Sequence, residues 1–308
     1  MKNVLIPFIM NYQNRQASPF NLSNSASYLA WRDSKLESYP LAIKDLIIPI
    51  KNPENLSFSE KNQILRLLYK TNMAFYQIET DIEVDKKGLA LLGKQFGLEN
   101  IDRTLTAAKD GITPLQVEAQ GERHDYIPYT DKPINWHTDG YYNEAKKPVQ
   151  AMLLHCGRPA LEGGDNQVVD NDLAYIHLRD KNPDYIEALM QDDVMTIPAN
   201  EQNGQILRAE SVGSVFSINE QGGLYTRYTA RKRNIVWKES TIVKQAVSEL
   251  NMFLNSASPY IFRHRLEPNQ GLICNNVLHN RSGFKNGEDL AAQRLMYRIR
   301  YCDSVREI

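Results

Sequence analysis

The segment Gln150-Ala151-Met152-Leu153-Leu154-His155-Cys156 is almost continuously apolar, and it decides the fold class. A short apolar run of this kind is typical of a strand buried inside a sheet. The turn signal Gly163-Gly164-Asp165 follows it. Further short strands are predicted around this segment, at 73–78, 166–170, 260–266, 271–274 and 294–301.

Helical patterns interrupt the strands without alternating regularly with them. They are predicted over 57–68, where Ser57 and Glu60 match a capping box, and over 85–96, 172–191 and 240–254. A parallel α/β fold therefore fits less well than a mainly-β fold with flanking helices. We expect a sandwich or jelly-roll core within one domain, residues 1–308. An irregular N-terminal extension is expected over 1–40, with helical insertions near 172–191 and 240–254.

The composition is that of a globular protein with a substantial core. Of the 308 residues, 42% are hydrophobic and 24% are charged, and the net charge is −1. This balance gives no reason to expect a nucleic-acid partner. Three cysteines are too few for a disulfide framework. No secretory signal or membrane span is visible, so a cytoplasmic location is expected. An oligomer is compatible with the sequence.

His137-Thr138-Asp139 is the first chemical signal in the chain. An imidazole and a carboxylate two residues apart on a strand point to the same face and can reach one metal ion. His279, in Asn275-Asn276-Val277-Leu278-His279, can supply a third ligand. Two histidines and one carboxylate leave three sites of an octahedral iron open, as in non-haem Fe(II) oxygenases.

Arg294-Leu295-Met296-Tyr297-Arg298-Ile299-Arg300-Tyr301 alternates strictly between two faces. The simplest interpretation is a solvated basic face backed by a packed one. Beside a metal site, an inward-facing arginine instead provides a planar fork for a carboxylate.

Together these segments resemble the taurine dioxygenase and clavaminate synthase group of Fe(II)/2-oxoglutarate-dependent oxygenases. The resemblance extends from about residue 40 to residue 301 and depends on the order and spacing of four segments: Trp136-His137-Thr138-Asp139, Gly163-Gly164-Asp165, Asn275-Asn276-Val277-Leu278-His279 and Arg294-Leu295-Met296-Tyr297-Arg298. It implies a double-stranded β-helix, or jelly roll, with flanking helices.

The resemblance also implies roles for individual residues. His137, Asp139 and His279 correspond to the Fe(II) ligands, and Arg294 to the arginine that binds the distal carboxylate of 2-oxoglutarate. Arg298 corresponds to a second arginine near substrate or cosubstrate. Asn166 stands where the taurine enzyme has a threonine that assists the same carboxylate. The cosubstrates are 2-oxoglutarate and O2, and the products include succinate and CO2.

An anionic substrate is expected because cations and aromatic residues concentrate at 224–234. Arg227 or Arg231 would join Arg298 in binding it, although a solvated edge strand explains the same pattern. Tyr126 lies in the loop upstream of the metal strand, which is either part of the substrate mouth or a plain connector. Sulfonates, amino acids and Kdo-type acidic sugars, free or in a glycolipid, suit the family.

Two other classes remain open from the residues alone. A zinc-dependent hydrolase could use the same three ligands with a bound water, but it leaves Arg294 unexplained. A non-catalytic jelly-roll binding protein could retain the ligands by descent.

Overall fold

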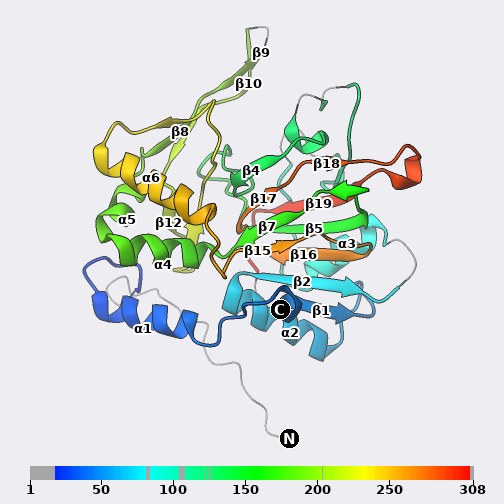
Figure 1. Cartoon of the computed structure of the whole chain (residues 1–308), viewed down its shortest axis with the longest axis horizontal. Helices are drawn as coiled ribbons and strands as arrows, with labels where there is room; N and C mark the ends of the chain where they lie inside the picture. The colour runs from blue at the N-terminus through cyan, green and yellow to red at the C-terminus, as the bar shows by residue number, and fades with distance from the viewer. Residues whose placement is uncertain are drawn as a thin grey trace, which may run out of the picture.

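The computed structural model describes residues 18–80, 84–103, 108–121, 123–124, 126–202 and 204–305. Two β-sheets form its centre, and helices cover their outer sides (Figure 1). The mainly-β expectation is thus confirmed. The described helices are α1 Ser25–Leu36, α2 Phe58–Thr71, α3 Lys86–Lys94, α4 Asn171–Lys181, α5 Pro183–Leu189 and α6 Thr241–Leu254, with short 3-10 helices η1 Ile43–Leu46, η2 Ile127–Tyr129 and η3 Leu290–Ala292.

The larger sheet has six strands and contains the apolar segment that opened the sequence. Its order is β1 Ile47–Ile50, β2 Met73–Ile78, β16 Gln270–Cys274, β5 Ala151–Arg158, β19 Leu295–Tyr301 and β3 Thr113–Leu115. All neighbours are antiparallel except β1 and β2. The buried, apolar strand β5 lies between β16 and β19. Strand β19, which carries Arg298 and Arg300, is therefore hydrogen-bonded to β5 along its length.

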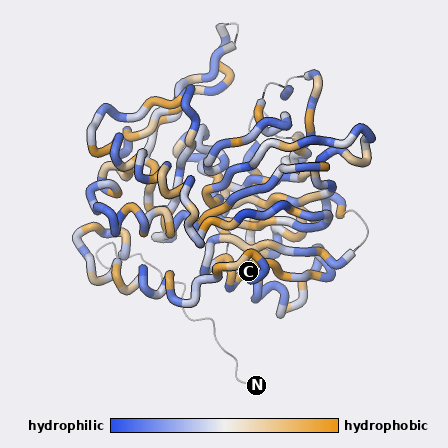
Figure 2. Tube along the Cα trace, in the orientation of Figure 1, coloured by the Kyte–Doolittle hydropathy of each residue, from blue (hydrophilic) through white to orange (hydrophobic). Residues whose placement is uncertain are grey.

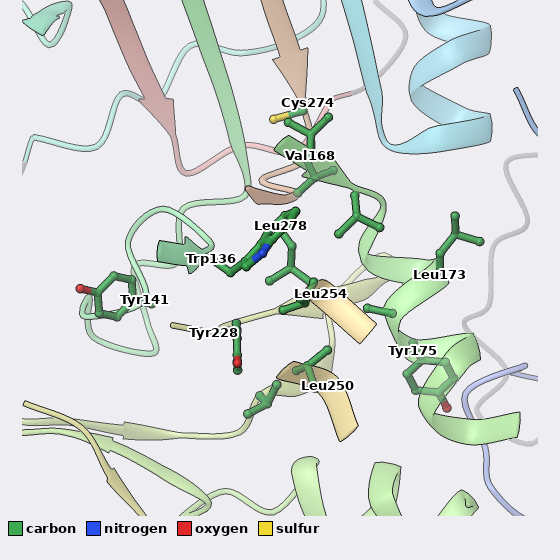
Figure 3. Packing of buried hydrophobic residues seen from close by; sticks show 14 of the residues in the cluster. Trp136, Tyr141, Val168, Leu173, Tyr175, Tyr228, Leu250, Leu254, Cys274 and Leu278 are labelled. Carbon is green, nitrogen blue, oxygen red and sulfur yellow. The ribbon is translucent and has the colours of Figure 1, made fainter. Parts of the chain in front are cut away.

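The smaller sheet has four strands and carries the histidines. Its order is β15 Phe262–His264, β7 Asn166–Val169, β17 Leu278–Arg281 and β4 Ile134–His137, all antiparallel. Val168, Leu278 and Trp136 from this sheet belong to the same buried cluster as Leu154 and Met296 from the larger one. Figure 3 shows part of this cluster, including Trp136, Val168, Leu278 and Cys274. The two sheets therefore share one core.

Short strands form the remaining sheets. Three of them form a sheet in the order β11 Ser211–Gly213, β8 Met195–Ile197 and β14 Val236–Trp237. The remaining pairs are β9 Asn200–Gln202 with β10 Gln205–Arg208, β12 Phe216–Ile218 with β13 Leu224–Thr226, and β6 Glu162–Gly163 with β18 Phe284–Lys285. The β9–β10 hairpin projects away from the body of the molecule (Figure 1).

The helices lie close to their predicted positions, with one correction. The capping box of α2 is present: the Ser57 hydroxyl accepts from the Glu60 N–H, and the Glu60 carboxylate accepts from the Ser57 N–H. The expectation that residues 1–40 are irregular is wrong for 25–36, which form α1. Lys35 on α1 pairs with Asp170 and Asp172, at 2.8 and 2.6 Å, and these long-range contacts hold the helix. Residues 1–17 lie outside the described part.

Among the described residues, no helix combines the length and apolar character needed to cross a membrane. Hydrophobic and hydrophilic stretches are instead interspersed along the chain (Figure 2).

Candidate metal and cosubstrate site

Strands β4 and β17 place two histidines opposite each other. His137 and His279 are direct partners in the antiparallel register, and their ring centroids lie 4.2 Å apart. Asp139 is the second residue after the end of β4, and its carboxylate lies near the two imidazoles. One ligand atom from each of these three side chains lies within 4.8 Å of the other two. The three residues proposed from the sequence are thus brought together.

The backbone fixes which nitrogen of each imidazole is available. His137 Nδ1 lies 2.9 Å from the Asn135 carbonyl oxygen, and His279 Nδ1 lies 2.8 Å from that of Val277. A carbonyl oxygen only accepts, so each Nδ1 carries the proton and donates. Each Nε2 is left with its lone pair, which is the form that binds a metal.

The charges at this point also favour a cation. Burial, helped by the neighbouring His279, lowers the pKa of His137 to about 3, and burial lowers the pKa of His279 as well. Burial on its own would raise the pKa of Asp139, but Arg298 and Arg300 outweigh it and hold that pKa well below its usual range. At neutral pH the site therefore contains two neutral imidazoles and one carboxylate.

The alternation predicted for β19 is confirmed. Met296 packs in the core shared by the two sheets, whereas Ile299 and Tyr301 pack in a second cluster on the other face. Arg298, on the Met296 face, places Nη1 3.2 Å from Asp139 Oδ1. Arg300 pairs with Asp102 at 3.0 Å and donates to the Tyr142 hydroxyl at 2.7 Å. The inward interpretation of this face is the correct one.

Arg294 lies at the start of β19 with its guanidinium buried. It lines a pocket together with Asn166, Gly164 and Met296. Burial lowers the pKa of Arg294 to about 10. Its Nη1 atom is buried and has no hydrogen-bond partner among the described residues. A buried guanidinium nitrogen without a partner is costly unless an anion completes it.

The Gly163-Gly164 turn lies beside Arg294 in this pocket. Both glycines have left-handed φ angles, 72° and 75°, and a Cβ at Gly163 would clash with the Gly283 carbonyl oxygen. Phe284 supports the guanidinium from β18, with Arg294 Cζ 5.1 Å from the ring centroid. The turn predicted from the sequence thus forms one wall of the pocket.

Arg227 does not face the site, which corrects its assignment as a substrate-binding residue. Its buried guanidinium donates to the carbonyl oxygens of Tyr141, Met195 and Ser211 at 2.8, 3.0 and 2.8 Å, and to that of Gly213 at 3.3 Å. Burial lowers its pKa to about 10. These bonds occupy the fork, so Arg227 holds together the loops around the site.

Arg231, by contrast, is exposed next to the metal strand. Two backbone hydrogen bonds join segment 228–230 to segment 136–138. The Ala230 N–H donates to the Trp136 carbonyl at 2.8 Å, and the Thr138 N–H donates to the Tyr228 carbonyl at 3.0 Å. Arg231 Nη1 lies 3.0 Å from the Tyr141 hydroxyl. The Tyr141 ring centroid is 6.3 Å from that of His137.

Arg208, on the β9–β10 hairpin, adds a further cation that the sequence did not suggest. Burial lowers the pKa of Arg208. The nearby hydroxyls of Tyr141, Tyr142 and Tyr126 raise this pKa but do not outweigh burial. Its guanidinium lies 5.8 Å from the Tyr142 ring centroid. Tyr126, predicted at the substrate mouth, is therefore near the same group of residues.

The residues present fit Fe(II) and 2-oxoglutarate. Asp139 Oδ2 is buried without a hydrogen-bond partner among the described residues, and two imidazole lone pairs lie beside it. The unpartnered Arg294 nitrogen suits a carboxylate at the far end of a dicarboxylic acid. No role was predicted for Asn276 from the sequence, although this residue lies in the segment that leads to His279. Its side chain forms hydrogen bonds with the Asp139 backbone, and a sequence does not show such bonds.

Comparisons with known proteins identify the family. Residues 37–300 match the family model "Taurine catabolism dioxygenase TauD, TfdA family". A uridine-5'-phosphate dioxygenase from Amycolatopsis sp is 29% identical over 211 residues, which cover 60% of this chain and 73% of that protein.

Solved structures share the fold at low sequence identity. An asparagine oxygenase in complex with Fe(II), 2S,3S-3-hydroxyasparagine and succinate has a TM-score of 0.59 and 13% identity, covering 80% of this chain and 81% of its own. AAD-2 in complex with Mn(II) and N-oxalylglycine has a TM-score of 0.61 and 10% identity, covering 86% and 96%. From the family match, the chain belongs to the taurine catabolism dioxygenase TauD/TfdA family and is an Fe(II)/2-oxoglutarate-dependent dioxygenase.

Proposed function

We propose that His137, Asp139 and His279 bind the Fe(II), that Arg294 binds the distal carboxylate of 2-oxoglutarate, and that the enzyme hydroxylates a C–H bond of an anionic small molecule. The observation that carries the proposal is the convergence of two Nε2 lone pairs and one carboxylate within 4.8 Å. When bound, iron supplies the oxidising step with O2, and 2-oxoglutarate is converted to succinate and CO2.

Arg294 supports the cosubstrate assignment because its Nη1 has no partner among the described residues and lies in a pocket. Asn166 lines the same pocket, and its amide can donate to the carboxylate where the family has a threonine hydroxyl. Arg298 is on the same face of β19 but is paired with Asp139. We therefore assign the distal carboxylate to Arg294, and Arg298 to the region between the metal and the substrate.

The substrate anion is assigned to Arg231 and Arg208, with Arg298 nearer the metal. Tyr141, Tyr142 and Tyr126 provide aromatic surface beside these cations. Arginines bind phosphate, sulfonate or carboxylate through their planar fork, and aromatic rings pack against a planar group of the substrate. This arrangement suits a compact anionic molecule that carries a ring.

The test panel follows from this chemistry. Uridine 5'-phosphate is the first compound to test, because one relative is a uridine-5'-phosphate dioxygenase. This compound also combines a phosphate with a planar base. Sulfonates, amino acids and Kdo-type acidic sugars, free or in a glycolipid, complete the panel.

The proposed architecture is a double-stranded β-helix in a single oxygenase domain. It is supported by the two antiparallel sheets with a common core, and by helices α4, α5 and α6 grouped on one side (Figure 1). Under this proposal α4 to α6 are insertions that form a wall outside the sheets.

The decisive experiment follows cosubstrate binding and turnover separately. Anaerobic protein with Fe(II) and 2-oxoglutarate is expected to show the weak visible charge-transfer band of the chelate, and His279→Ala is expected to lose it. In air, succinate is expected to form fastest with the true substrate of the panel. A zinc hydrolase predicts activity without oxygen, and a binding protein predicts no succinate. Absence of both the band and succinate would contradict the proposal.

A further inference from the structure

Asn276 connects the two segments that carry the candidate metal ligands. Its side-chain oxygen accepts from the Asp139 N–H at 2.8 Å, and its amide nitrogen donates to the Asp139 carbonyl at 2.9 Å. The same nitrogen donates to the Val149 carbonyl at 2.6 Å. The amide thus holds both backbone groups of one ligand residue, while its own backbone lies three residues before His279.

The position is buried and conformationally demanding. Asn276 is only 1% exposed, and its φ of 47° is left-handed. Asparagine tolerates this region better than most residues, but glycine adopts it without steric cost. A glycine at this position would keep the turn and remove only the side-chain bonds.

Asn171 fixes the other end of the same turn. Its amide nitrogen donates to the Asn276 carbonyl at 3.2 Å, and its side-chain oxygen accepts from the Leu278 N–H at 2.9 Å. Asn171 is the first residue of α4 and is buried. The backbone N–H of Leu278, immediately before His279, is therefore bonded to a side chain from the first residue of α4.

The turn is also connected to the buried ion pair of α1. Asn275 donates to the side-chain oxygen of Asn72 at 3.0 Å, and the Asn72 amide donates to Asp170 and Asp172 at 2.8 and 3.0 Å. Both carboxylates pair with Lys35. A continuous polar chain thus runs from α1 to Asp139 inside the protein.

We propose that Asn276 is a positioning residue that sets the separation between Asp139 and His279, with Asn171 supporting it. The inference rests on the proposed function, in which these two residues bind the metal. Asn276 acts on the site through the Asp139 backbone and touches no ligand atom. Outer residues that orient metal ligands typically contribute about 10–100-fold to metal affinity.

The test compares Asn276→Gly with a matched control, Asn269→Gly. Asn269 is also buried (7% exposed) with a left-handed φ of 61°, and its amide donates to the Thr80 carbonyl at 2.9 Å. It precedes β16, at the end of that strand opposite Asn275 and Asn276. Both variants therefore lose a buried asparagine amide from a turn that glycine accepts.

Co(II) added to metal-free full-length protein serves as the probe, and its visible ligand-field spectrum reports both affinity and ligand geometry. Asn276→Gly is expected to weaken Co(II) binding about 10–100-fold and to change the spectrum. Asn269→Gly is expected to keep the wild-type affinity and spectrum, although it too lowers the melting temperature. Asn171→Ala, at an ordinary helical position, is expected to follow Asn276→Gly and replaces it if that variant does not fold.

His279→Ala separates this inference from the function on which it rests. If His279→Ala keeps wild-type Co(II) binding, the proposed metal site itself is wrong. If His279→Ala loses binding while Asn276→Gly and Asn171→Ala retain wild-type affinity and spectrum, the metal site stands and the positioning role is overturned.

Discussion

Arg298 and Asp139 form a buried ion pair in the metal site, with Nη1 and Oδ1 3.2 Å apart and side chains that are 11% and 5% exposed. Arg298 therefore compensates the negative charge of Asp139 in metal-free protein. A divalent metal bound to the same carboxylate would compensate part of this charge instead.

The pair predicts that Arg298→Met is destabilising in a way that depends on metal. Removing one partner of a buried pair leaves an uncompensated charge and costs about 3–5 kcal/mol. The free energy of unfolding of metal-free protein should therefore fall by about this amount. Saturating Mn(II) should restore most of it, because the metal neutralises Asp139. Urea titrations with and without Mn(II) measure the effect.

Arg263→Met is the control for that experiment. Arg263 and Asp165 are also 3.2 Å apart, but the Arg263 side chain is 66% exposed. An exposed pair contributes about 0–1 kcal/mol, so this variant should remain near wild type in both conditions. Equal destabilisation of Arg298→Met with and without Mn(II) would refute the proposed exchange of partners.

Arg294→Leu is predicted to weaken 2-oxoglutarate binding strongly and to stabilise the metal-free fold. Losing a desolvated partner for a carboxylate costs about 2–5 kcal/mol of binding, which is about 30-fold to several thousand-fold in 2-oxoglutarate affinity. Burial lowers the pKa of Arg294 to about 10, so its charge is unfavourable when no anion is bound beside it. The melting temperature of metal-free protein should rise.

Anaerobic titration of the charge-transfer band with 2-oxoglutarate measures the affinity, and Arg294→Lys serves as the comparison. Lysine keeps the charge but not the planar fork, so its affinity should be intermediate. An unchanged affinity in Arg294→Leu would instead assign the distal carboxylate to Arg298.

The buried histidines predict how the stability of metal-free protein varies with pH. Burial lowers the pKa of His137 to about 3 and that of His155 to about 4, and lowers that of His279. Above about pH 6.5 these groups are neutral in both states and contribute nothing. As the pH falls below that value, only the unfolded chain takes up protons. Stability should therefore fall, by up to about 1.4 kcal/mol per pH unit for each histidine.

The pH range in which these histidines affect stability is separate from the range in which Asp139 does. Its pKa is lowered in the folded state, so its contribution is present above about pH 3.9 and is lost only below that value. His155 is bonded to the Tyr76 hydroxyl, away from the metal ligands. Replacing His155 with Phe should make the dependence of stability on pH shallower between pH 6 and pH 5. A slope unaffected by this change would show that other groups control the acid transition.

Local patterns were sufficient to predict the longest strands and most of the described helices. The apolar run of β5, the alternation of β19 and the capping box of α2 are properties of a few neighbouring residues, and each lies where it was expected. Helix α1 was missed because only Tyr28 and Lys35 on it are buried, so it has little apolar periodicity. Its stability comes from partners far away in the sequence, which local periodicity does not show.

The same limit applies to the site. The residue types and their order predicted His137, Asp139 and His279 as metal ligands, because metal binding restricts residue identity strongly. The family resemblance added the prediction for Arg294. Alternation could place Arg227 on a strand face, but it could not show that four carbonyl oxygens face its guanidinium. The bonds of Asn276 and the position of Arg208 depend on contacts between distant segments, which the sequence does not encode locally.

Arg227 and Arg231 provide a paired test of which arginine meets the substrate. Arg227→Met leaves buried carbonyl oxygens without donors, so it should cost about 3 kcal/mol of stability or more. Arg231 is exposed, and its guanidinium donates to the Tyr141 hydroxyl. Arg231→Gln should therefore leave stability within about 0.5 kcal/mol of wild type. It should raise the KM for the anionic substrate about tenfold or more by removing a charge-assisted contact. Urea unfolding and succinate formation measure the two effects. If Arg231→Gln leaves that KM unchanged, the anion site must be moved to Arg208 and Arg298.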